Sequence, residues 1–235
     1  MLIPFPDDWS RALCVVAHPD DLEYGMAGAI AKWTAAGREV SYLLVTRGEA
    51  GIDGMSPAET AVVREAEERA SARVVGVSAV EFLDGHADGV IEYGLPLRRD
   101  LAYAIRRHRP EVLFGLNQRD SWGGRSRNSP DHRNVGLALL DAAGDAGNRW
   151  VFPVDGVEPW SGVRLTAFSG SPEPTHYVDI GEHIETGIAS LREHVTYIEG
   201  LGGSFDPDAF LRGNARGAGE SVGCEYAVTI EVFGG

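Results

Sequence analysis

The sequence has little cysteine and no long apolar run, and both shortages narrow the class of protein. Its 235 residues include two cysteines, Cys14 and Cys224, so no disulfide framework is expected, and both are predicted to be small hydrophobes in a reducing compartment. No apolar run reaches the roughly 18 residues needed to cross a bilayer. The first ten residues contain Asp7 and Asp8 but no basic residue, which is not typical of a signal peptide. We therefore expect a cytoplasmic protein without a membrane span.

Positive charge is also scarce. The chain has 21 Lys and Arg against 35 Asp and Glu, a formal net charge of −14. Such a chain repels phosphate backbones and anionic lipid, so nucleic acid is not an expected partner. Hydrophobic residues make up 43% and charged residues 24% of the chain, as in ordinary globular proteins. The length suits one domain over residues 1–235, with a small molecule as the expected ligand.

Short apolar runs alternate with amphipathic stretches, which predicts a Rossmann-like α/β fold with a parallel sheet covered by helices on both faces. The predicted strands cover residues 12–17, 40–46, 79–83, 112–116, 163–168, 177–180 and 226–232. The predicted helices cover residues 26–36, 57–75, 95–108, 131–143 and 182–201. The last strands and the last helix, in the carboxyl-terminal part, are predicted to extend the Rossmann-like core. Two glycine-rich segments, 118–130 and 202–223, are interpreted as loops. The second is a candidate for ordering by another copy of the chain, which makes a homo-oligomer a candidate assembly.

Residues that can bind a metal follow the first predicted strand, at the sheet edge where open parallel sheets bind ligands. The segment AHPDD places one imidazole and two carboxylates within four residues. Proline disfavours the helical conformation of His18, and His18 and Asp21 can converge on one point across a turn. This pattern suits a metal ion with a free Asp20 carboxylate beside it. The alternative is that both aspartates cap the following helix.

A catalytic zinc site commonly has three protein ligands and one open position, so a third ligand must come from elsewhere in the chain. His132 follows the fourth predicted strand and opens a helix at the same edge of the sheet. His86, after the third predicted strand, is the rival candidate. The other histidines are interpreted as structural: His108, His176, His183 and His194.

At this point the motifs AHPDD and PDH, in this order after the first and fourth strands, resemble the PIG-L or LmbE-like family of zinc-dependent de-N-acetylases. The resemblance covers about residues 11–200, including TRGEAG after the second strand and the helix that contains Arg64. It implies a Rossmann-like fold and removal of an acetyl group from an N-acetylated small molecule such as an amino sugar. It also implies three zinc ligands, His18, Asp21 and His132, and a general base, Asp20.

One position departs from the family pattern. The family motif is HPDH, whose first histidine is expected to assist the oxyanion or protonate the amine, and this chain has Ser129 there. A serine hydroxyl can donate a hydrogen bond but cannot carry positive charge. Asp20 would then act as both base and acid, with an arginine stabilising the oxyanion: Arg47, Arg125 or Arg127. Weak activity or a different substrate is the other explanation.

Further residues at this edge are candidates for the site, each with a plainer alternative. Asp131 is a candidate acceptor that fixes a neighbouring side chain, or a helix N-cap. Arg64 is a candidate substrate contact, or an ion-pair partner of Glu67 or Glu68. The remaining candidates could instead be surface charges, turn residues or packing residues. They are Arg47, Glu49, Asp84, Asp88, Trp122, Ser129 and Trp160.

Two other functions stay open at this stage. The chain could be a catalytically idle module that binds a metal or small ligand, or a zinc hydrolase of another bond, such as an ester or carbamate. The cation could also be Fe²⁺ or another divalent ion, because two histidines and one carboxylate suit ferrous iron as well.

Overall fold

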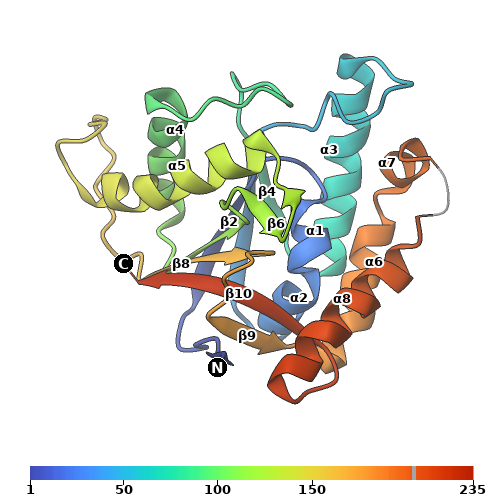
Figure 1. The fold of residues 1–235 in the computed structure, drawn as a ribbon. Coiled ribbons are helices and arrows are strands. Elements are labelled where there is room, and N and C mark those ends of the chain that lie inside the picture. The colour runs from blue at the N-terminus through green and yellow to red at the C-terminus, as the bar shows by residue number, and fades with distance from the viewer. Residues whose placement is uncertain (203–204, 235) are drawn as a thin grey trace.

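The computed structural model describes residues 1–202 and 205–234, which form an open sheet covered by helices (Figure 1). Eight strands pair in the order β1-β9-β10-β8-β5-β2-β3-β4, and β6 and β7 form a separate hairpin. The strand bounds are β1 Ile3–Pro4, β2 Arg11–Val16, β3 Glu39–Leu44, β4 Ala79–Phe82, β5 Val112–Leu116, β6 Ser121–Gly123, β7 Ser126–Arg127, β8 Leu165–Ser169, β9 His176–Asp179 and β10 Ala227–Gly234.

The helices cover both faces of this sheet. Helices α4 and α5 pack on one face, and α1, α2, α3, α6 and α8 lie on the other (Figure 1). Their bounds are α1 Asp21–Gly25, α2 Ala27–Ala35, α3 Pro57–Val74, α4 Leu95–His108, α5 Pro130–Gly147, α6 Ile184–Arg192, α7 Val195–Gly200 and α8 Pro207–Val222, with a 3₁₀ turn η1 over Gly181–His183.

The central strands β2, after Arg11, and β5 are apolar because both of their faces are covered. The side chains of Ala12–Val16 in β2 and of Val112–Leu116 in β5 are all buried, as expected for parallel strands between two helical layers. Strands β4, β3, β2, β5 and β8 are parallel, and β10 runs antiparallel between β8 and β9. The predicted α/β fold with a mainly parallel sheet is therefore confirmed.

The parallel order brings the carboxyl ends of β2, β3, β4 and β5 to one edge of the sheet. The segments that follow these strands contain His18, Arg47, Asp84 and the loop leading to His132. The fold thus places most of the candidate site residues at a single edge.

Two sequence predictions about elements were wrong. The segment 202–223 is not a loop, because α8 fills Pro207–Val222, starting at an Asp206 cap whose carboxylate accepts amide hydrogen bonds; residues 203–204 lie outside the described residues. Its glycines misled the prediction: Gly213 and Gly217 face open space, where a missing side chain loses no packing. The predicted helix 182–201 is interrupted at residues 193–194, whereas the predicted helix 26–36 agrees with α2 to within one residue at each end.

Helix α1, strand β1 and the hairpin of β6 and β7 were not foreseen. The two-residue strand β1 pairs with β9, and the hairpin of β6 and β7 lies inside the segment 118–130 that was expected to be a loop. Among the described residues, no helix combines the length and apolar character required for crossing a bilayer.

Candidate active site

The turn after β2 is closed by the carboxylate of Asp21. Its Oδ2 accepts hydrogen bonds from the amides of Ala17 and His18, at 3.0 and 2.9 Å. Asp20 stands at the N-cap position of α1 with a left-handed backbone, φ 87°, and its side chain makes no capping hydrogen bond. The two aspartates therefore do not act as helix caps.

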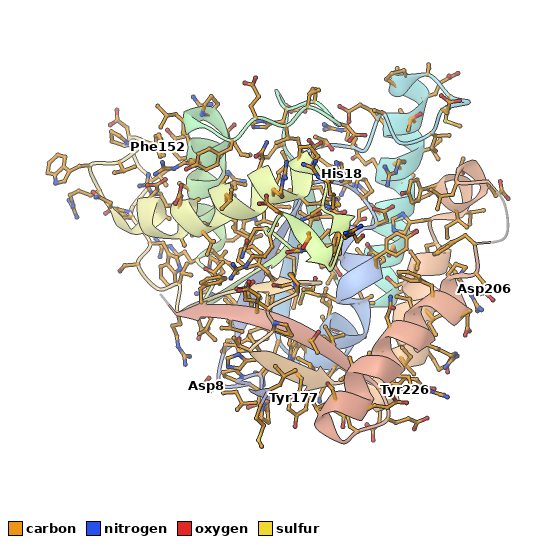
Figure 2. The ribbon with its side chains drawn as sticks, in the orientation of Figure 1. Asp8, His18, Phe152, Tyr177, Asp206 and Tyr226 are labelled. Atoms are coloured by element: carbon orange, nitrogen blue, oxygen red, sulfur yellow. The ribbon has the colours of Figure 1, made fainter. Side chains whose placement is uncertain are left out.

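The same Asp21 carboxylate joins two imidazoles from distant parts of the chain. Asp21 Oδ1 lies 3.1 Å from His132 Nε2, and Asp21 Oδ2 lies 3.6 Å from His18 Nδ1. The structure thus brings the three predicted metal ligands together, with one ligand atom of each within 4.8 Å of the others. We call His18, Asp21 and His132 the open cluster, because both imidazole side chains keep 15% of their surface exposed. Figure 2 labels His18 near the end of α5.

The outward nitrogen of each imidazole is held by an oxygen. His18 Nε2 lies 3.0 Å from Asp88 Oδ1 and 3.2 Å from Asp131 Oδ2, and His132 Nδ1 lies 2.9 Å from Asn128 Oδ1. Metal-binding histidines are typically oriented in this way, because the outer acceptor fixes which nitrogen faces the ion. The residues present therefore fit a divalent cation held by His18 Nδ1, His132 Nε2 and Asp21.

The electrostatics of the open cluster favour positive charge. Burial alone would lower the pKa of His18, but Asp21, Asp131 and Asp88 raise it well above its usual range. Burial opposes ionisation of Asp21, yet the nearby His132 and His18 outweigh it and hold the Asp21 pKa far below its usual range. Protons and a cation consequently compete for these ligands.

Asp20 faces a different set of groups. Its side chain is buried, and burial raises its pKa to about 6 despite the opposing charge of Arg64. Arg64 Nη2 lies 3.1 Å from Asp20 Oδ2. The guanidinium also donates to the carbonyls of Pro19 and Gly48 and stacks on the Tyr197 ring at 4.1 Å. A carboxylate with a pKa near 6 can both take up and release a proton near neutral pH.

A second group of the same residue types lies behind Asp20. Glu23, Glu68 and His194, which we call the closed cluster, each have at most 1% of their surface exposed. His194 Nε2 lies 3.7 Å from Glu23 Oε2 and 3.8 Å from Glu68 Oε2. Burial and the neighbouring Glu23 raise the Glu68 pKa well above its usual range. Burial would lower the pKa of His194, but Glu23 raises it.

A cavity of about 910 Å³ opens at the open cluster. One wall comes from the strand exits of the amino-terminal part, including His18, Asp20, Asp88 and His132. The lining residues from the carboxyl-terminal part are mostly apolar and include Ile180, Ile184, Tyr197, Phe210, Leu211 and Ala215. The cavity is large enough for a small molecule, since typical ligand pockets have volumes of roughly 300–1,000 Å³.

Known proteins share both the sequence and the arrangement of these elements. The profile of the family described as PIG-L, GlcNAc-PI de-N-acetylase, matches residues 13–143. The chain belongs to the PIG-L family. Members of this family are N-deacetylases, and the amidohydrolase class predicted from the sequence is therefore confirmed.

Individual PIG-L relatives extend the likeness over the whole chain. A diacetylchitobiose deacetylase of Thermococcus kodakarensis is 32% identical over 99% of this chain and 86% of its own. A 1D-myo-inositol 2-acetamido-2-deoxy-alpha-D-glucopyranoside deacetylase of Rhodococcus erythropolis is 29% identical over 78% of this chain and 66% of its own. The solved N,N'-diacetylchitobiose deacetylase of Pyrococcus horikoshii superposes with a TM-score of 0.85 at 27% identity, covering 97% of this chain and 85% of that one.

The position that departs from the PIG-L motif has a local structural role. Ser129 is the N-cap of α5, and its Oγ accepts the amide hydrogen of Asp131 at 3.1 Å. Asp131 is therefore not the cap. Its carboxylate instead accepts the amides of Gly89 and Ile91, at 2.7 and 3.1 Å, and also contacts His18. The geometry therefore excludes the cap, and the acceptor that fixes a neighbouring side chain stays the prediction for Asp131.

Several other candidates lie against protein groups. Arg47 pairs with Glu65 and with the exposed Asp84, and its Nη1 donates to the Leu83 carbonyl. Trp160 donates to the Pro110 carbonyl. The described residues that line the cavity do not include these side chains or Ser129, Arg125 and Arg127.

The remaining candidates divide between the cavity and the fold. Trp122 lines the cavity and its ring lies 5.7 Å from that of His132. Glu49 accepts the Asp88 amide hydrogen at 3.0 Å and so helps to shape the loop that contacts His18. His86, the rival ligand, pairs with Asp100 at 3.1 Å instead.

Sequence reasoning missed two features of the site. The Asp88 contact with His18 was not foreseen, because an Asp-Gly pair after a strand resembles an ordinary turn. The closed cluster was also missed, since Glu68 was considered only as an ion-pair partner of Arg64 and His194 only as structural. The spacing of four between Arg64 and Glu68 puts both on one face of α3, but it does not point to Glu23 or His194.

Proposed function

We propose that this chain is a zinc-dependent deacetylase that removes the acetyl group from an N-acetylated amino sugar. The observation that carries the proposal is the open cluster: two imidazoles, each oriented by an outer oxygen, converge with Asp21, and the buried Asp20 carboxylate faces the same cavity. The names of the relatives support an N-acetylglucosaminyl substrate, since they act on diacetylchitobiose and on a glucosaminyl inositol.

In this proposal His18, Asp21 and His132 hold the ion. A bound zinc ion supplies Lewis acidity, which polarises an amide carbonyl and lowers the pKa of a coordinated water from 15.7 to about 7. Asp20 accepts the proton of the attacking water as the C–O bond forms. The same carboxyl then delivers that proton to the amine nitrogen as the C–N bond breaks, so acetate and free amine are the products.

The surroundings of Ser129 support a double role for Asp20. Ser129 is occupied as a helix cap, and the donors of Arg47 are directed to Glu65, Asp84 and the Leu83 carbonyl. Asp20, by contrast, is buried at the cavity with a pKa raised by burial to about 6. It is therefore the side chain best suited to return the proton that it has taken up.

The proposal is tested by measuring metal content and both products together. The purified chain is incubated with N,N'-diacetylchitobiose and with N-acetylglucosamine, and free amine and acetate are quantified. We expect equal amounts of the two products, loss of turnover on chelation, and recovery with about one zinc per chain. Turnover of O-acetyl sugars without turnover of the amides would favour an esterase, and bound zinc without any turnover would favour an idle module.

A further inference from the structure

The backbone at Asp20 adopts a conformation that side-chain-bearing residues seldom adopt. Its φ of 87° lies in the left-handed region, which is sterically disfavoured for residues other than glycine. This conformation turns the carboxylates of two adjacent residues to different partners. Asp21 contacts His18 and His132, whereas Asp20 contacts Arg64. Some other part of the protein must therefore hold Asp20 in this conformation.

Helix α3 holds both ends of the peptide group that joins Pro19 to Asp20. Arg64 Nη2 donates to the Pro19 carbonyl oxygen at 2.5 Å, and Glu68 Oε2 accepts the Asp20 amide hydrogen at 3.2 Å. Arg64 and Glu68 are one helical turn apart on the same face. A flipped peptide would point its N–H at the Arg64 guanidinium, which is repulsive, and would lose the hydrogen bond that Glu68 accepts from the Asp20 amide. The pair therefore selects one orientation of this peptide.

We propose that Glu68 is a positioning residue for Asp20, which fixes the peptide before Asp20 and so aims its carboxylate into the cavity. This inference rests on the proposed role of Asp20 as the base. Glu68 is not among the described residues that line the cavity, so it acts through Asp20 and not on the substrate. Its burial at 1% exposure keeps water from replacing the hydrogen bond to Asp20.

The closed cluster gives Glu68 its surroundings. His194 lies between Glu68 and Glu23, and Ser71 donates to Glu23 Oε1 at 2.6 Å. Glu68 Oε1 and both ring nitrogens of His194 have no hydrogen-bond partner among the described residues. Within the described part of the chain, the Glu68 carboxylate therefore has one hydrogen-bond partner, the Asp20 amide.

Two substitutions at Glu68 separate hydrogen bonding from the ability to ionise. Glu68→Met keeps the length of the side chain but removes the acceptor, and Glu68→Gln keeps an acceptor oxygen without an ionisable group. We expect Glu68→Met to lower kcat roughly 10- to 100-fold, as small displacements of a reacting group do, while KM and metal content stay near wild type. Glu68→Gln should recover most of that loss, because its amide oxygen can accept the Asp20 amide hydrogen.

The matched control is the adjacent Glu67. It is also buried on α3, and its Oε1 accepts a backbone amide hydrogen at 2.6 Å, from Thr196 instead of Asp20. Glu67→Met should therefore lower the melting temperature, as Glu68→Met does, but leave kcat within about threefold of wild type. Equal losses of kcat in the two methionine variants would overturn the proposal, because the effect would then be one of general stability.

Hydrogen exchange of the Asp20 amide tests the same contact without any assay of activity. We expect this amide to exchange faster in Glu68→Met than in wild type, and at near-wild-type rates in Glu68→Gln and Glu67→Met. Unchanged exchange in Glu68→Met overturns the positioning role whatever the enzyme does. Altered exchange in a chain that deacetylates nothing would uphold the contact and reject the proposed function instead.

Discussion

The open and closed clusters contain the same kinds of side chain, imidazoles and carboxylates, yet they differ in access and in hydrogen bonding. In the open cluster, both imidazoles are partly exposed and each has its outer nitrogen held by an oxygen. In the closed cluster the three side chains are buried, and several of their polar atoms have no partner among the described residues. The same donor types therefore occur in two different settings. Exposure of the imidazoles and the oxygens that hold their outer nitrogens distinguish the two clusters.

Loss of an imidazole from the open cluster has the largest expected effect. His132→Ala should reduce metal content from about one ion per chain toward zero. Amine release should fall roughly 10³-fold or more, since a catalytic metal supplies several kcal/mol of transition-state stabilisation. Elemental analysis and the amine assay check both outcomes. His86→Ala is the control. His86 pairs with Asp100 and not with the open cluster, so this variant should retain about one ion per chain. Full metal content in His132→Ala would contradict the assignment.

Removing the proposed base should separate chemistry from metal binding. Asp20→Asn retains the shape of the side chain and tolerates the left-handed backbone, but cannot accept a proton. We expect kcat to fall roughly 10²- to 10⁴-fold, with the ion still bound. If metal content falls as it does in His132→Ala, then Asp20 is a ligand, and its role has been confused with that of Asp21.

The closed cluster should respond in stability and not in metal content. His194→Ala leaves Glu23 and Glu68 facing each other without the imidazole between them. Removing one partner from a buried ionic group typically costs about 3–5 kcal/mol of folding free energy, and we expect a loss near the lower end in urea unfolding. Loss of an ion in this variant would mean that the closed cluster also binds metal.

The smallest expected effect is a change in the pH profile. The Asp20 carboxyl, whose pKa burial raises to about 6, can accept a proton only when ionised. As pH falls below this value the protonated form predominates. Accordingly, kcat/KM should drop about tenfold per pH unit below about pH 6 and level off above it. In Asp20→Asn the residual rate should lack this acidic limb, and a limb that persists would assign it to another group.

Sequence alone predicted the regular elements whose ends have local signals. The helix from Pro57 follows from the Ser56-Pro57 start, which the structure shows as a capping box with Glu59. The strand over residues 112–116 is a buried apolar run with the same bounds in the structure. Helix α8 was missed because its glycines suggested a loop, although Asp206 and Pro207 form a typical helix start.

The candidate site was predictable where one motif carries it and not where distant segments meet. His18, Asp21 and His132 could be proposed from two short motifs. The closed cluster could not, because Glu68 and His194 are 126 positions apart and charged residues are seldom fully buried. Spacing carries no information about such long-range contacts.

The lining of the cavity comes from different stretches of the chain. All the proposed reacting groups lie between His18 and His132, whereas much of the apolar lining comes from residues from Ile180 onward. Selection for a new substrate can therefore change the apolar lining of α6 and α8 while the proposed reacting groups keep their sequence. If the carboxyl-terminal segment is exchanged between two relatives, the substrate preference should follow that segment.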